Sequence, residues 1–125
     1  MRGIQRFRRG LVVGALSMAW GIPAMATVHY ACGGPVDGVT VSPGGVVSAS
    51  SAGGQHWGYF CQLGATTNGV SNDACKGILA TLLAAQASGK SVNLWFDDDY
   101  DCNWHASNGA WAWLNTVYWG PSILN

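Results

Sequence analysis

Acidic residues gather at one place in this chain. Four aspartates fall within residues 97–101. Carboxylates at this density are typical of a cation site with oxygen ligands, or of an acid/base pair for glycoside hydrolysis. The run lacks the spaced ligands and the glycine of an EF-hand loop, so we interpret it as an acidic, solvated loop and predict no metal and no cofactor. A small glycoside hydrolase that uses the cluster from Asp97 to Asp101 remains an alternative.

Tryptophan is the second unusual feature. Six tryptophans lie between residues 27 and 125. Large rings with a polar N–H suit surfaces that are wet on one side, so we expect some of them to stack on sugars or dock a partner, and the others to fill the core. Aromatic rings and polar side chains near the acidic run form a candidate ligand-binding set. Its members are Trp104, Trp111, Trp113, Asp98, Asp99, Asn103 and His105.

Catalytic motifs are missing from the sequence. The chain contains neither a G-x-S-x-G elbow nor an H-E-x-x-H zinc motif. The serines and aspartates show no spacing that singles out a nucleophile, and the cysteines are expected to be paired. We therefore predict no catalytic residue and no enzymatic activity.

Four cysteines indicate a framework of disulfides. The even count, in a small domain expected to be exported, favours pairing, and no C-x-x-C spacing suggests a zinc site. Cys61 and Cys75 bracket the loop ahead of the expected helix, and closing it removes about 3 kcal/mol of unfolded-state entropy. We predict that these two pair, which leaves Cys32 to pair with Cys102.

The first 26 residues have the pattern of a secretory signal peptide. Four arginines precede an apolar run at 11–20 that is short for a membrane span, and Ala24-Met25-Ala26 fits a cleavage site. An uncut membrane anchor is the alternative. Cleavage near Ala26 leaves two lysines against six aspartates, a net charge of −4. We therefore expect a secreted or periplasmic protein that does not bind nucleic acid.

A helix followed directly by a strand organises residues 71–97. Ser71 can cap the helix, Gly89 can end it, and residues 92–96 alternate as a strand does. Apolar residues recur along the helix at spacings of three and four. The expected core consists of Ile78, Leu79, Leu82, Leu83, Val92, Leu94 and Phe96, together with Phe60.

The remaining strands are expected on both sides of this unit. Residues 36–41 and 46–49 read as a hairpin, 55–63 as a third strand, and 110–119 as a final strand that ends at Gly120-Pro121. The predicted order is β-β-β-α-β-β, mainly β with one helix. That is the order of a five-stranded OB-like barrel, so we predict one disulfide-stapled OB-like domain over residues 27–125.

Three stretches of this unit form a pattern that can be compared with a known family: Tyr59-Phe60-Cys61, Asn72-Asp73-Ala74-Cys75 and residues 87–94. Through them, residues 59–97 resemble the binding (B) subunits of subtilase-cytotoxin and pertussis-like toxins. The resemblance implies a secreted bacterial OB-fold protein that binds glycans and forms a ring of identical subunits. No glycan-contacting residue carries over, because residues 36–54 do not align with the family's early strands.

These observations together predict a secreted, non-catalytic binding module whose ligand is a glycan or a glycosylated surface. The lack of cations disfavours an oligonucleotide, the other common ligand of OB folds. The alternative is a structural or interaction protein that docks a partner subunit through its Trp-rich surface.

Overall fold

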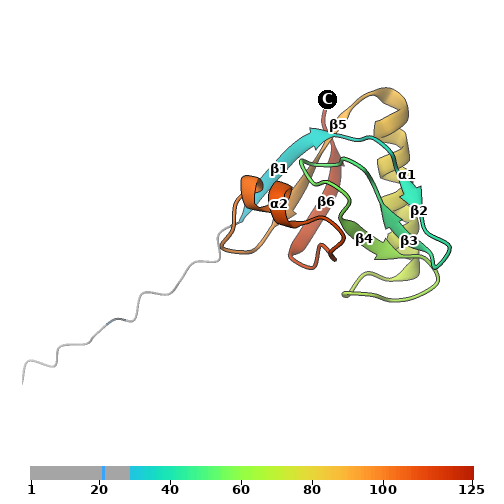
Figure 1. The fold of residues 1–125 in the computed structure, drawn as a ribbon, viewed down its shortest axis with the longest axis horizontal. Coiled ribbons are helices and arrows are strands. Elements are labelled where there is room, and N and C mark those ends of the chain that lie inside the picture. The colour runs from blue at the N-terminus through green and yellow to red at the C-terminus, as the bar shows by residue number, and fades with distance from the viewer. Residues whose placement is uncertain (1–20, 22–28) are drawn as a thin grey trace, which may run out of the picture.

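The computed structural model describes Gly21 and residues 29–125 (Figure 1). The predicted signal peptide, apart from Gly21, lies outside the described residues. Within the described part of the chain, no helix is long and apolar enough to cross a membrane.

Helix α1 (Asn72–Ser88) and strand β5 (Ser91–Phe96) form the unit that the sequence predicts. The Ser71 side chain accepts a hydrogen bond from the Ala74 N–H, which caps the first turn. Gly89 ends the helix in the left-handed conformation, with φ of 67°. Alternate residues of β5 are buried, because one face of the strand packs on the core.

Two small antiparallel sheets flank this unit. In the first, β5 lies between β1 (Tyr30–Pro35) and β6 (Val117–Ile123). The second contains β2 (Thr40–Val41), β3 (Val46–Ser48) and β4 (Tyr59–Gln62). A second helix, α2 (Cys102–Asn108), lies between β5 and β6 in the chain. Figure 1 shows α1 beside the second sheet and α2 beside the first.

The predicted OB-like barrel is therefore wrong. The described chain has two helices and six strands in two three-stranded sheets, in the order β-β-β-β-α-β-α-β. Strand β1 was not among the predicted strands, and its Gly33 and Gly34 pair with Asn93 and Val92 of β5. The short helix α2 was also missed, because its Asp101 cap is part of the acidic run.

The last strand starts later than predicted. The chain from 110 to 116 is not a regular strand, and β6 begins at Val117 and continues through Gly120 and Pro121. Pro121 is tolerated because β6 lies at the edge of its sheet, where a missing backbone donor costs least. The predicted strand at 55–63 is also shorter than expected, since only β4 (Tyr59–Gln62) is a strand within it.

The core has most of the predicted members. Leu82, Val92, Leu94 and Phe96 are fully buried, Phe60 is nearly so, and partly buried Ile78 and Leu79 pack against them. The prediction that Leu83 belongs to the core is wrong, because its side chain is 45% exposed. The buried face of α1 is centred on Cys75, Leu82 and Ala85, so Leu83 points away from it.

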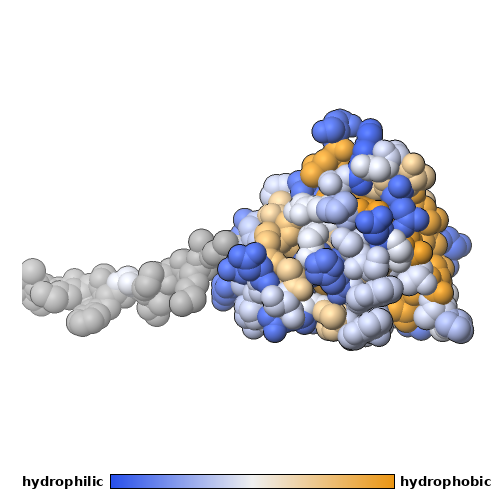
Figure 2. Space-filling model, turned by 45° about the horizontal axis from the view of Figure 1, so that its top comes forward, coloured by the Kyte–Doolittle hydropathy of each residue, from blue (hydrophilic) through white to orange (hydrophobic). Residues whose placement is uncertain are grey.

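Apolar colour gathers on the right-hand side of the molecule in Figure 2, the side on which α1 lies in Figure 1. Ala80, Leu83 and Ala84 are exposed residues of this helix. The outer face of α1 therefore carries few charges.

Both predicted disulfides are present. Cys61–Cys75 ties β4 to α1, and Cys32–Cys102 ties β1 to the start of α2. The first closes a loop of 14 residues and the second one of 70 residues. The two bridges together fix α1 and α2 to opposite sheets.

Candidate functional site

A row of aromatic side chains forms where two distant chain segments run in parallel. Trp111 N donates to Trp57 O at 2.9 Å, Tyr59 N to Ala112 O at 2.9 Å, and Leu114 N to Tyr59 O at 3.0 Å. This pairing brings four aromatic rings together. We call them the aromatic strip. It consists of Trp57, Tyr59, Trp111 and Trp113.

Each ring of the strip contacts at least one other ring of the strip. Trp57 and Trp111 are stacked, with centroids 5.3 Å apart and planes 11° apart. Tyr59 meets Trp111 and Trp113 edge-on, at 6.5 and 5.4 Å. Trp57 is 37% exposed and Trp111 63% exposed, so the stacked pair faces solvent rather than the core.

Backbone strain is concentrated at this stacked pair. Trp57 has φ of 55° and Trp111 has φ of 59°. This left-handed conformation places Cβ against the following carbonyl and costs a non-glycine residue about 1–2 kcal/mol. Neither tryptophan offsets the cost by full burial. Strain of this kind clusters at functional sites, which makes the pair the leading candidate for one.

A groove of about 260 Å³ runs along the outer part of the strip. Trp57, Tyr59 and Trp111 form one side of it. The other side comes from the β2–β3 hairpin and is lined by Thr40, Ser42, Val46 and Ser48. No carboxylate, lysine or histidine is among these lining residues. The groove therefore combines aromatic faces with hydroxyl groups and carries no formal charge.

The hydroxyls in the groove keep part of their hydrogen-bonding capacity. Ser42 Oγ accepts from the Val46 N–H at 3.1 Å, so its proton remains for a ligand. Ser48 is buried and its Oγ donates to Gly58 O at 2.9 Å, so it supports the wall of the groove. The hydroxyls open to a ligand on this side of the groove are those of the exposed residues Thr40 and Ser42.

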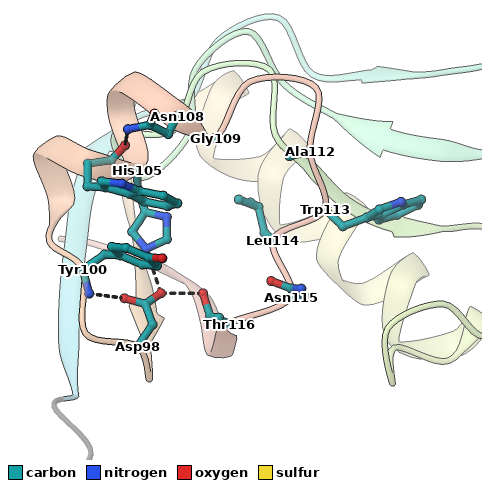
Figure 3. A pocket seen from close by; sticks show the side chains of 11 residues that line it. Asp98, Tyr100, His105, Asn108, Gly109, Ala112, Trp113, Leu114, Asn115 and Thr116 are labelled. Carbon is teal, nitrogen blue, oxygen red and sulfur yellow. Dashed lines mark hydrogen bonds and ion pairs between the residues drawn. The ribbon is translucent and has the colours of Figure 1, made fainter.

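A larger pocket of about 440 Å³ adjoins the strip at Trp113 (Figure 3). Helix α2 and the segment that follows it form its walls. The lining residues are Asp98, Tyr100, Trp104, His105, Asn108, Gly109, Ala112, Trp113, Leu114, Asn115 and Thr116. Figure 3 shows Asp98, His105 and Tyr100 on one side of this pocket and Leu114 and Trp113 on the other.

Asp98 is the hub of a nearly buried network beside this pocket. Its Oδ1 accepts from the Tyr30 hydroxyl and from the Tyr100 N–H, the latter at 2.9 Å. Its Oδ2 accepts from His105 Nε2 at 2.9 Å and from Thr116 Oγ1 at 2.6 Å. A carboxylate has about four lone-pair positions, so all of them are used. Asp98 is left without a lone pair for a cation or for proton transfer.

The network shifts the acidity of two of its members. Burial raises the pKa of Asp98, but the hydrogen bonds from Thr116, Tyr30 and Tyr100 and the neighbouring His105 together lower it below its usual value. Burial, and then the Asp98 carboxylate, raise the pKa of the Tyr30 hydroxyl well above its usual 10.0. Asp98 is thus held ionised and Tyr30 neutral at physiological pH.

His105 has a structural position in this network. Its side chain is 7% exposed, and its ring stacks on Phe96 with centroids 3.9 Å apart. Because ionised Asp98 only accepts hydrogen bonds, Nε2 must be a protonated ring nitrogen. The stacking of His105 on Phe96 fixes α2 to β5. Because Nε2 carries a proton, it cannot act as a base.

The candidates predicted from the sequence divide into three groups. Asp98, Trp104, His105 and Trp113 line the pocket. Trp111 lines the neighbouring groove. Asp99 and Asn103 are exposed and line neither.

Sequence reasoning missed Trp57 and Tyr59 as members of the site. The signal that could have found them is a repeated aromatic–small–aromatic triplet, Trp57-Gly58-Tyr59 and Trp111-Ala112-Trp113. The small central residue faces the opposite side, and a Cβ at Gly58 would lie 3.1 Å from the Leu114 side chain.

Metal binding has no obvious place in the described part of the chain. Over Gly21 and residues 29–125, no cluster of three or more His, Cys, Asp or Glu side chains is arranged to hold an ion. In the acidic run, Asp98 is saturated and Asp101 Oδ1 caps α2 by accepting from Trp104 N at 2.7 Å.

Comparison with known proteins adds no relative, since no protein-family model, curated protein or solved structure matches this chain. The resemblance to toxin B subunits therefore stays a prediction from the sequence.

Proposed function

We propose that this chain is a secreted or periplasmic, non-catalytic binding module that holds a neutral glycan against the aromatic strip. The strained, exposed stack of Trp57 and Trp111 is the observation that carries the proposal. Neither ring belongs to the buried core, and the stacked pair offers a ligand with apolar C–H faces a large flat platform.

The chemistry of the groove supports a sugar over other ligands. Pyranose rings present C–H faces together with hydroxyls that both donate and accept hydrogen bonds. The groove offers aromatic faces, a free donor at Ser42 and the exposed hydroxyl of Thr40. Its uncharged lining favours a neutral ligand, because a charged group would lose hydration without an ionic partner.

The non-catalytic part of the proposal has its own support. A glycosidase needs two carboxylates, one of them free to exchange a proton. All four lone-pair positions of Asp98 accept hydrogen bonds, and Asp101 caps a helix. Release of reducing sugar from an oligosaccharide, abolished by Asp99→Asn, would show that the protein is instead a hydrolase.

The test is a glycan array followed by calorimetric titration of the best neutral oligosaccharide. Trp57→Ala and Trp111→Ala should each weaken binding by about tenfold or more, as stacking losses usually do. Trp111→Gly should weaken it equally, and glycine tolerates the positive φ, so unfolding would not explain the loss.

Trp119→Ala is the matched control. Trp119 is 67% exposed on β6 and does not line the groove. Its removal should leave affinity unchanged. Equal losses in the Trp119 and Trp111 variants would refute the assignment of the strip, as would the absence of binding to any glycan at millimolar concentration.

A partner-docking protein is the second candidate, favoured by the edge strand β6. Tyr118, Trp119, Ile123 and Leu124 expose large apolar side chains along it. The resemblance to toxin subunits adds the expectation of a ring. Light scattering that gives a stable oligomer, lost in Trp119→Ala but kept in Trp111→Ala, would favour this candidate.

A further inference from the structure

The pocket beside Trp113 differs in chemistry from the groove. Its wall carries the apolar side chains Ala112 and Leu114 and the ring of Trp104. Two amides, Asn108 and Asn115, lie at the same pocket. A ligand group that fits must therefore present an apolar part and an amide-like polar part close together.

We propose that this pocket receives the acetamido group of an N-acetylated sugar residue, an inference that rests on the proposed glycan-binding function. The methyl group would contact Ala112 and Leu114. Asn108 Nδ2 donates to Trp104 O at 2.9 Å, which leaves Oδ1 to accept from the acetamido N–H. The Asn115 amide supplies a donor for the acetamido carbonyl.

Other sugar substituents fit the pocket less well. A hydroxyl could reach Asn108 or Asn115, but it has no apolar part to place against Ala112 and Leu114. A carboxylate would meet no lysine or arginine in the pocket and would lie close to the ionised Asp98. A protonated amine would be attracted to Asp98, but all four lone-pair positions of that carboxylate are taken.

The pocket and the strip are continuous through Trp113. Trp113 lies at the edge of the pocket, and Figure 3 shows its ring directed away from Asp98 and His105. The ring packs against Tyr59 with centroids 5.4 Å apart. One oligosaccharide can therefore lie on the strip while a substituent on one of its sugars enters the pocket. The strip supplies general affinity for sugar rings and the pocket selects the acetylated one.

The experiment titrates the full protein with three β-1,4-linked oligomers of equal length, built from glucose, N-acetylglucosamine and glucosamine. We expect the acetylated oligomer to bind about tenfold more tightly than the glucose oligomer, from one buried methyl group and one hydrogen bond. Ala112→Tyr fills the pocket and should remove this preference while glucose-oligomer binding persists.

Asn103→Ala, exposed on α2 and outside the pocket, is the control and should keep the preference. Equal affinity for the acetylated and glucose oligomers overturns the pocket inference but leaves the proposed function intact. Tightest binding of the glucosamine oligomer also overturns it, since the pocket would then select a positive charge. No binding of any of the three oligomers also overturns the pocket inference, and together with a glycan array on which nothing binds it refutes the proposed function itself.

Discussion

Removing the Asp98 carboxylate should destabilise the protein more than any other single change in the acidic run. Asp98→Ala leaves the Tyr30 and Thr116 hydroxyls without their acceptor, and leaves His105 Nε2 only the Tyr30 oxygen 3.0 Å away. The Asp98 and His105 side chains are only 9% and 7% exposed. Each orphaned donor costs about 1–3 kcal/mol, and the adjoining pocket lets water reach some of them. We expect a total loss of about 3–5 kcal/mol.

A conservative variant separates charge from shape. Asp98→Asn keeps the volume and one oxygen, but its Nδ2 faces two donors that need an acceptor. About half of the hydrogen bonds that the Asp98 side chain accepts are lost, so we expect the free energy of unfolding to fall by roughly 2 kcal/mol. Asp99→Asn is the matched control, because Asp99 is exposed and should change the free energy of unfolding by less than about 0.5 kcal/mol.

The assay is urea unfolding of non-reduced protein, followed by tryptophan fluorescence. A domain of this size has about 5–15 kcal/mol of stability in total, so the loss in Asp98→Ala would be plain in the unfolding midpoint. A loss under 1 kcal/mol, or one equal to that of the Asp99 variant, would refute the view of Asp98 as a hub.

The pH dependence of folding stability gives a second test of the role of Asp98. Because the pKa of Asp98 is lowered in the folded state, its contribution is complete above the unfolded pKa of about 3.9 and is lost as pH falls through the folded value. The stability gap between wild type and Asp98→Asn should therefore narrow as the solution is acidified. If the difference in stability between wild type and Asp98→Asn stays constant down to the acid transition, the pKa of Asp98 is not lowered in the folded state.

Three further predictions concern the core and its edges. Leu82→Ala should cost about 2–5 kcal/mol in urea unfolding, whereas exposed Leu83→Ala should cost under 1 kcal/mol, and the reverse order would mean the wrong helix face. The pKa of Tyr30 is raised, so its contribution to folding stability is complete below pH 10.0 and is lost at higher pH. Above that pH, Tyr30→Phe should therefore lose less stability than wild type. If the stability of both proteins falls equally with pH in this range, Tyr30 does not belong to the network. Gln55 is 1% exposed and neither of its amide atoms has a partner in the described residues, so Gln55→Met should raise stability by about 1–3 kcal/mol, whereas a loss would indicate a buried water on the amide.

The parts of the fold that sequence predicts are those with local signals. The Ser71 cap, the left-handed Gly89 and the alternation of β5 each depend on neighbours in the chain, and all three are confirmed. The disulfides were within reach because Cys61 and Cys75 lie close in sequence and only one further pairing remains.

The parts that escaped prediction depend on distant partners. Gly33 and Gly34 become strand residues only through pairing with β5, some 60 residues later. The aromatic strip likewise depends on backbone hydrogen bonds between 57–59 and 111–114, and a left-handed Trp111 contradicts its own propensity for a regular strand. Thus Trp111 and Trp113 could be named as candidates, but the groove beside them could not.

The parallel pairing of 57–59 with 111–114 also has a consequence for biogenesis. Trp57 and Tyr59 are made early and Trp111 and Trp113 late, so a nascent chain holds only half of the strip until its last segment arrives. That segment follows directly on α2, which the Cys32–Cys102 bridge fixes to β1. Under the proposed function, retention on an immobilised glycan would therefore select oxidised chains that extend through residue 114, and separate them from shorter or reduced ones in a single step.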